Sequence, residues 1–97
     1  MGQWKGTVES RNLRMTATIE FTTSYNVAER LYMREWHGQG YSDRPWRHVF
    51  FEDMDIETNV GEIRILKQTK MDNGLFEIEF KGNGVPKGRL ADAIGNV

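Results

Sequence analysis

The chain has 97 residues, which is enough for one hydrophobic core but too few for two independent ones. It carries 13 basic and 14 acidic residues, so its net charge of -1 excludes the overall positive field of a dedicated nucleic-acid-binding domain. Because 38% of the residues are hydrophobic, we expect a folded chain. We expect one domain over residues 1–97, with the core in 1–81 and a glycine-rich loop and tail in 82–97.

The sequence contains neither cysteine nor a long apolar segment. The absence of cysteine excludes disulfides, thiol catalysis and zinc sites that need thiolate ligands. The longest apolar run, Val49–Phe51, is far shorter than the roughly 20 residues that span a bilayer, and Met1–Trp4 does not open a signal peptide. We therefore expect a cytoplasmic protein without membrane contact, metal or cofactor.

A strand is the clearest element near the N-terminus. Residues Leu13–Phe21 alternate strictly between apolar and polar side chains. A period of two places the apolar residues on one face, so this strand is half-buried in an antiparallel sheet and its threonine-bearing face points toward water or a partner. The preceding run, Trp4–Glu9, is the expected hairpin partner.

The segment Val27–His37 predicts a helix. Asn26 and Glu29 have the spacing of a capping box, and Gly38 is a typical C-terminal stop. At helical spacing the basic residues fall on one face and the apolar residues on another. The apolar face would carry Val27, Ala28, Leu31, Tyr32 and Trp36, with Glu35 at its centre.

A strand is the alternative for this segment. It would place Leu31 and Met33 on one side and Tyr32, Arg34 and Trp36 on the other. The segment is short enough to satisfy either period.

The remaining elements follow from turn residues and alternation. Gly38–Pro45 predicts an exposed loop, and Trp46–Phe51 predicts a strand. Val60–Thr69 and Leu75–Lys81 predict a hairpin in which Glu77 and Glu79 face Arg64 and Lys67. The glycines after Lys81 exclude a further strand, and Arg89–Ile94 is at most a short helix.

This order of elements, β-β-α-β-β-β, predicts an α+β domain. It would contain a mainly antiparallel sheet of about five strands, with one helix packed on one face. An all-β small barrel is the alternative. Neither architecture implies a function by itself.

The densest basic segment of the chain is interleaved with aromatic residues. Guanidinium groups bind phosphates and carboxylates, whereas aromatic rings stack on bases or pack against apolar ligands. The alternative interpretation is that the tryptophans anchor the core and the arginines are solvated. The candidate binding residues are Arg34, Trp36, His37, Tyr41, Arg44, Trp46, Arg47 and His48.

An acidic run follows this basic segment. Five carboxylates lie between Val49 and Ile63 with no basic residue among them, yet no calcium-loop spacing is present. A solvated or partner-facing acidic strand is the alternative to a cation site. Opposite charges on one small domain also favour symmetric self-association. The carboxylates are Glu52, Asp53, Asp55, Glu57 and Glu62.

Two catalytic or phosphate-binding patterns are incomplete. Ser42, Asp43, His37 and His48 supply the residue types of a hydrolase, but no Gly-x-Ser-x-Gly pattern occurs. The loop Gly82–Gly88 lacks the Gly-Lys-Ser/Thr order of a phosphate loop, so we interpret it as a mobile loop.

The leading functional hypothesis is a small non-catalytic binding protein that forms a homodimer. Its aromatic-basic site would hold an anionic small ligand or an acidic protein partner. A nucleic-acid-binding protein that uses the same segment is one alternative. A small hydrolase-type enzyme that uses His37, His48 or the acidic run is another.

Overall fold

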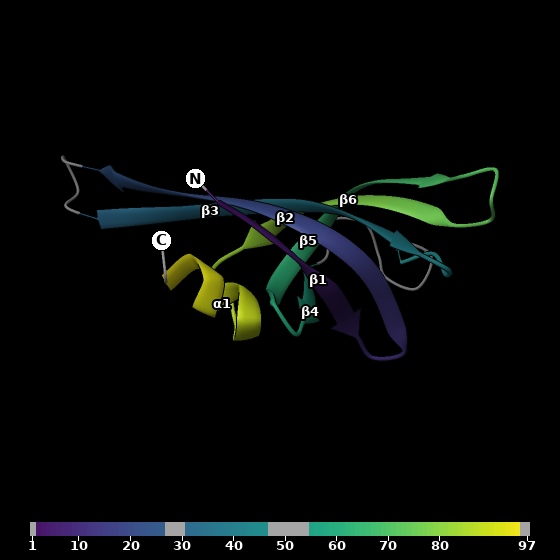
Figure 1. Cartoon of the computed structure of the whole chain (residues 1–97), viewed down its shortest axis with the longest axis horizontal. Helices are drawn as coiled ribbons and strands as arrows, with labels where there is room; N and C mark the ends of the chain where they lie inside the picture. The colour runs from purple at the N-terminus through teal and green to yellow at the C-terminus, as the bar shows by residue number, and fades with distance from the viewer. Residues whose placement is uncertain (1, 27–30, 47–54, 96–97) are drawn as a thin grey trace.

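The structure is a computed structural model that describes residues 2–26, 31–46 and 55–95. Within these residues, six strands form one antiparallel sheet in the order β1-β2-β3-β6-β5-β4, and one helix follows the last strand (Figure 1). The elements are β1 (Gly2–Ser10), β2 (Leu13–Asn26), β3 (Leu31–Ser42), β4 (Ile56–Thr58), β5 (Gly61–Lys70), β6 (Phe76–Asn83) and α1 (Gly88–Gly95). The predicted antiparallel sheet is confirmed.

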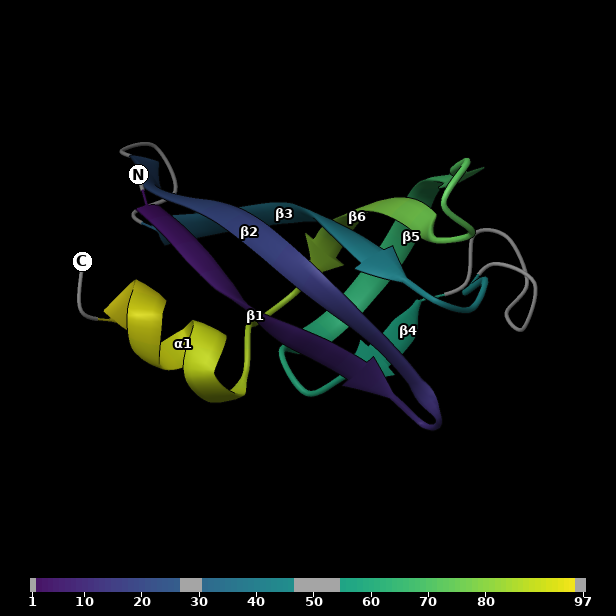
Figure 2. The same cartoon turned by 45° about the vertical axis from the view of Figure 1, so that its right-hand side comes forward.

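The first hairpin is formed as predicted. Strands β1 and β2 pair from Ser10 opposite Leu13 to Gly2 opposite Phe21. Arg11 turns the chain with a positive φ of 54°, a conformation that tight hairpin turns require. Between Leu13 and Phe21 the apolar residues of β2 are buried on the concave inner face of the sheet, while the polar residues between them lie on the convex outer face (Figure 2).

The helix predicted over Val27–His37 is wrong for the described residues 31–37. Residues Leu31–Ser42 form strand β3, as in the alternative interpretation, and β3 pairs with both β2 and β6. Two strand ladders outweigh a local capping pattern, whose Glu29 lies outside the described residues. Glu35 is consequently exposed on the outer face, next to the buried Trp36.

The predicted loop Gly38–Pro45 is also mostly strand. Gly38 and Gly40 belong to β3 and lie on its inner face, where large side chains cover them. A methyl group at Gly38 would sit 2.5 Å from the Phe80 ring and 2.9 Å from Ile19. These glycines resemble turn signals in the sequence, but their role is to let rings pack against the backbone.

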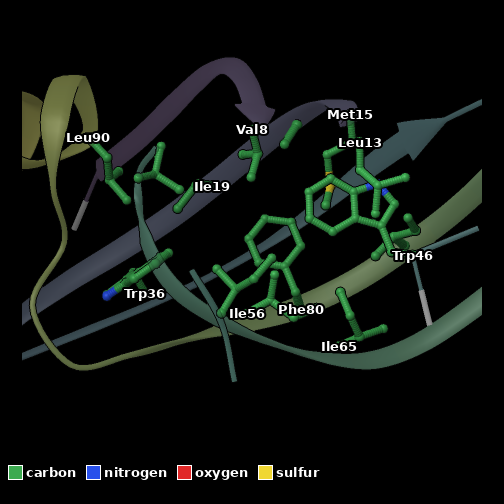
Figure 3. Close-up of a cluster of buried hydrophobic side chains, with 14 of the residues drawn as sticks. Val8, Leu13, Met15, Ile19, Trp36, Trp46, Ile56, Ile65, Phe80 and Leu90 are labelled. Atoms are coloured by element: carbon green, nitrogen blue, oxygen red, sulfur yellow. The ribbon is translucent and has the colours of Figure 1, made fainter. Parts of the chain in front are cut away.

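The same arrangement recurs across the inner face. Gly2 lies opposite and beneath the Phe21 ring, Gly82 lies beneath the Trp36 indole, and each glycine lacks the space for a Cβ atom. Figure 3 shows the resulting core, in which Phe80 lies centrally between the strands and Trp46 packs near Met15 and Leu13. Large side chains can thus fill the space on the inner face of the curved sheet, because the residues beneath them are glycines.

The second hairpin is confirmed, with one irregularity. Strands β5 and β6 pair in antiparallel register, and Lys67 lies opposite Glu79 as expected. Arg64 instead lies opposite Lys81, while Glu77 lies opposite Thr69. A register shift between Ile65 and Lys67 forms a bulge that directs Leu66 to the surface, where it is 52% exposed.

The sheet curls into a half-barrel whose two edge strands approach each other (Figure 2). Asn59 joins them: its Oδ1 accepts from the Glu9 amide at 2.7 Å, and its Nδ2 donates to the Thr7 carbonyl at 2.9 Å. The Asn59 amide also donates to the Glu9 carbonyl. The all-β alternative therefore describes the architecture better than a helix placed in the middle of the chain.

Helix α1 packs beside β1 (Figure 2). Leu90 and Ile94 are buried in the main core, so the end of the described chain contributes to packing. The predicted short helix at Arg89–Ile94 is confirmed within the longer Gly88–Gly95. The predicted strand Trp46–Phe51 lies outside the described residues, apart from Trp46.

No helix in the described ranges is long and apolar enough to cross a membrane.

We predict that Gly38→Ala destabilises the protein by about 1–3 kcal/mol, because the added methyl group overpacks the Phe80 ring. Phe80→Leu should relieve this clash, so the double variant should lose less stability than the sum of the single losses. Urea unfolding of the four proteins measures the coupling, with the exposed Lys81→Ala as control. Strictly additive losses would contradict the packing constraint.

We also predict that Asn59→Ala lowers the free energy of unfolding by about 1–2 kcal/mol, because the edge groups of Thr7 and Glu9 lose their partners. Asn59→Asp should not restore stability, because a carboxylate cannot donate to the Thr7 carbonyl. Thermal and urea unfolding check both variants. A wild-type stability for Asn59→Asp would show that the amide donor has no role in closure.

Candidate functional site

The two candidate tryptophans lie in the core. Trp36 is 3% exposed, and its Nε1 donates to the Gly84 carbonyl at 3.1 Å. Trp46 is fully buried, and its Nε1 donates to the Ser42 hydroxyl at 3.2 Å. The N–H groups of both indoles are thus hydrogen-bonded and both rings are buried, in agreement with the interpretation of these residues as core anchors.

Tyr41 and Arg44 are the two candidate residues that the structure brings together. Tyr41 lies on the outer face of β3 and Arg44 follows the end of that strand. Together they line a surface hollow of about 330 Å³, which we call the cationic hollow. Its other lining residues are Asn12, Arg14, Thr16 and Asp43.

The remaining candidates are distributed elsewhere. His37 lies on the outer face of β3, four residue pairs away from Tyr41 along the ladder with β2. Arg34 lies near the start of β3, opposite Thr23. Arg47 and His48, which end the segment of candidate binding residues, lie outside the described residues.

The cationic hollow contains one guanidinium that is engaged and one that is available. The Arg14 Nε lies 3.0 Å from Glu9 Oε1 in an exposed ion pair. The Arg44 guanidinium has no ion pair with any residue in the described ranges, and only its backbone amide is bonded, to the Ser42 hydroxyl. Arg44 is therefore the group best placed to bind an incoming carboxylate.

A second hollow of about 380 Å³ lies further along the same face, and we call it the acidic hollow. His37 Nε2 lies 3.4 Å from Glu20 Oε2 on one side of it. The Glu79 carboxylate lines it without a hydrogen bond or ion pair to the described chain, and Leu66 adds an apolar surface. The hollow is lined by Thr18, Glu20, His37, Gly38, Gln39, Leu66, Glu79 and Phe80.

Sequence reasoning missed the acidic hollow because four different strands form it. Glu20 is on β2, His37 on β3, Glu79 on β6, and Leu66 reaches the surface only through the bulge in β5. No spacing in the sequence relates these residues. Arg14 was missed for a similar reason, since only the pairing of β2 with β3 brings it near Arg44.

The two hollows adjoin each other on the outer face. Thr16 is paired with Tyr41 in the cationic hollow, and the next outward-facing pair along the ladder, Thr18 with Gln39, belongs to the acidic hollow. A hollow lined by two arginines and an aspartate and a hollow lined by two glutamates and a histidine therefore lie in series along β2 and β3. Their common border is a neutral, threonine-containing surface.

A third hollow, of about 510 Å³, lies beside β1 and the start of α1. Lys5 and Arg89 line this hollow, and Arg44 does not. None of the candidate binding residues contributes to it. It provides a comparison surface with two exposed cations.

Two carboxylates of the acidic run, Asp55 and Glu57, are paired in the structure. Asp55 accepts from Arg64 at 3.2 Å and from Asn83 at 2.6 Å, while Glu57 binds Lys87 at 2.9 Å. No group of three or more histidine and carboxylate side chains in the described part of the chain could hold a metal ion. Glu52 and Asp53 lie outside that part.

The residues of the other two patterns are separated by the fold. Ser42 is buried on the inner face, where its hydroxyl accepts from Trp46, whereas His37 is exposed on the outer face. In the loop Gly82–Gly88, the Gly84 carbonyl binds Trp36, and the Lys87 amide donates to the Val60 carbonyl. This loop is thus tied to the core at two points.

The pair Glu57–Lys87 gives a testable pH dependence. Its hydrogen bond and its charge attraction hold the pKa of Glu57 below the ordinary 4.5 and raise the pKa of Lys87 above 10.5. A carboxyl group with a lowered folded-state pKa stabilises the fold above its unfolded pKa, and this contribution is lost as the pH falls through the folded value.

We predict that wild-type protein loses more stability than Glu57→Gln when the pH falls from about 5 to about 3, because only wild type must protonate this paired carboxylate. Urea unfolding at a series of pH values measures the difference. Glu35→Gln serves as control, since Glu35 has no ion pair in the described chain. Equal pH slopes for wild type and Glu57→Gln would contradict the prediction.

No family model matches the chain, and no curated protein or solved structure matches it. The functional interpretation therefore rests on the residues of the outer face.

Proposed function

We propose that this protein is a small non-catalytic binding protein whose outer face holds an acidic partner at the cationic hollow. The observation that carries the proposal is the convergence of Arg14, Tyr41 and Arg44 on one hollow. These residues come from β2, from β3 and from the segment after β3, so the sheet pairing brings them together. A guanidinium binds a carboxylate in a forked geometry, and a tyrosine ring supports the aliphatic part of an acidic side chain.

The form of the hollow favours a protein segment over an enclosed small molecule. Its volume of about 330 Å³ is at the lower end for ligand pockets, and every residue that lines it is exposed. Such a surface can receive one or two carboxylate side chains of a partner while leaving the rest of that partner outside. Tyr41, at 43% exposed, offers apolar area at its centre.

The charges around the hollow also favour an acidic protein over a polynucleotide. Glu9 pairs with Arg14, and Asp43 lines the same hollow, so the local field is mixed in sign. A phosphate backbone requires a run of uncompensated cations. A short acidic segment needs only the available guanidinium of Arg44 and suitable hydrogen-bonding neighbours.

A cytoplasmic location is part of the same proposal. A chain without cysteine is compatible with a reducing compartment.

We predict that a hexaglutamate peptide binds weakly to the cationic hollow at low salt. Amide chemical shifts should change at Arg14, Tyr41 and Arg44 during an NMR titration. Arg44→Ala should weaken binding about threefold to fivefold, because an exposed ion pair contributes up to about 1 kcal/mol. Added salt should weaken binding in wild type.

Arg89→Ala is the matched control, because it removes an exposed arginine beside the third hollow. It should leave the affinity for hexaglutamate unchanged. Shift changes centred on Lys5 and Arg89, or an equal loss in both variants, would assign the peptide to general charge attraction and overturn the proposed site. A tighter complex with a single-stranded polynucleotide of equal charge would favour the nucleic-acid alternative.

A further inference from the structure

We propose that the outer face of β2 and β3 binds a second copy of this chain about a two-fold axis. The inference deepens the proposed function and rests on it, because the second copy supplies the acidic partner of the cationic hollow. The axis would lie parallel to the face, between the two copies. It would run at right angles to β2 and pass between Thr16 and Thr18. Each copy would then present the same surface to the other, as a two-fold interface requires.

The outward-facing residues of β2 form a self-complementary series. Four of them, in chain order, are Arg14, Thr16, Thr18 and Glu20, which lie toward the start of the strand. Rotation about an axis between the two threonines places Arg14 over Glu20 of the second copy, and Glu20 over Arg14. Each threonine lies over the other threonine position, where small hydroxyl side chains allow close approach.

Strand β3 carries a series of opposite polarity beside it. The register pairs Thr16 with Tyr41, Thr18 with Gln39 and Glu20 with His37, while Asp43 lines the same hollow as Arg14. The same rotation places Asp43 over His37 of the second copy. Each end of the contact would therefore hold Arg14 and Asp43 of one copy against Glu20 and His37 of the other, so Arg14 faces a carboxylate and Asp43 faces an imidazole.

The same axis places an exposed aromatic side chain of each copy at a hollow of the other. Tyr41 lines the cationic hollow and is 43% exposed. The rotation sets it over Gln39 of the second copy, within the acidic hollow of about 380 Å³. The contact would thereby cover Tyr41, one of the three large hydrophobic side chains that the described chain exposes.

The curvature of the sheet limits the contact to these strands. Because the outer face is the convex side of the half-barrel, β1 and β5 bend away from a flat contact centred on β2 and β3 (Figure 2). Such a contact is small and polar, and its strength depends on the charged ends. Charge reversal is therefore the sharpest test.

The experiment uses sedimentation velocity on wild type, Arg14→Glu and Glu20→Arg, each alone, and on an equal mixture of the two variants. Both substitutions are at exposed positions, and circular dichroism verifies folding. We expect wild type to dimerise and each variant alone to dimerise at least about tenfold more weakly, because like charges then face each other twice.

The mixture should restore dimerisation to near the wild-type level. The glutamate introduced by the first substitution then faces the arginine introduced by the second, while the unchanged Arg14 of one variant faces the unchanged Glu20 of the other. Both ends of the contact thus regain a pair of opposite charges.

Arg89→Glu is the control for net charge, and it should dimerise like wild type because Arg89 lies beside the third hollow. A monomeric wild type at millimolar concentration would overturn the inference, and so would a mixture no stronger than its components. In both cases hexaglutamate binding at Arg44 can still succeed, so the proposed function would stand. If the mixture recovers the dimer while hexaglutamate fails to bind, the cationic hollow takes its acidic partner from a second copy of this chain, and binding of other acidic segments is overturned.

Discussion

The fold depends on a steric constraint: large side chains on the inner face require glycines beneath them. Gly38 lies under Phe80, Gly82 under Trp36 and Gly2 under Phe21, and none of the three positions has room for a Cβ atom. A sheet that curls tightly around a small core cannot give every inner position a large side chain. Alternating rings with bare backbone resolves this conflict, because each ring fills its own position and that of its neighbour.

Strand alternation separates the core from the proposed binding surface. Strict alternation sends Trp36 inward and His37 outward, and it sends Ser42 inward and Tyr41 outward. A segment that is both aromatic and basic in sequence is therefore divided between two faces. Its tryptophans contribute to stability through burial and hydrogen bonds to Gly84 and Ser42, whereas Tyr41 and Arg44 remain available at the surface.

The sequence is sufficient to predict elements whose pattern is local. Both hairpins are predictable because alternation and turn residues adjoin each other along the chain, as in Leu13–Phe21. Strand β3 is not, because its glycines resemble turn signals until Phe80 is placed over Gly38. The outer hollows could not be predicted. Arg14 and Arg44 line one hollow only because β2 pairs with β3, and Leu66 and His37 line the other only because of strand pairing and the bulge in β5.

Closure of the half-barrel by Asn59 has a consequence for the order in which the fold assembles. Each hairpin joins residues near in sequence, whereas Asn59 must reach Thr7 and Glu9 about 50 positions away. Loop closure over such a distance costs entropy that is recovered only when the final contacts form. We therefore expect the two hairpins to form before the seam, with the ring-lined inner face open to solvent until the seam and α1 dock. This late step is the stage of folding at which the chain is most exposed to association with other partly folded chains.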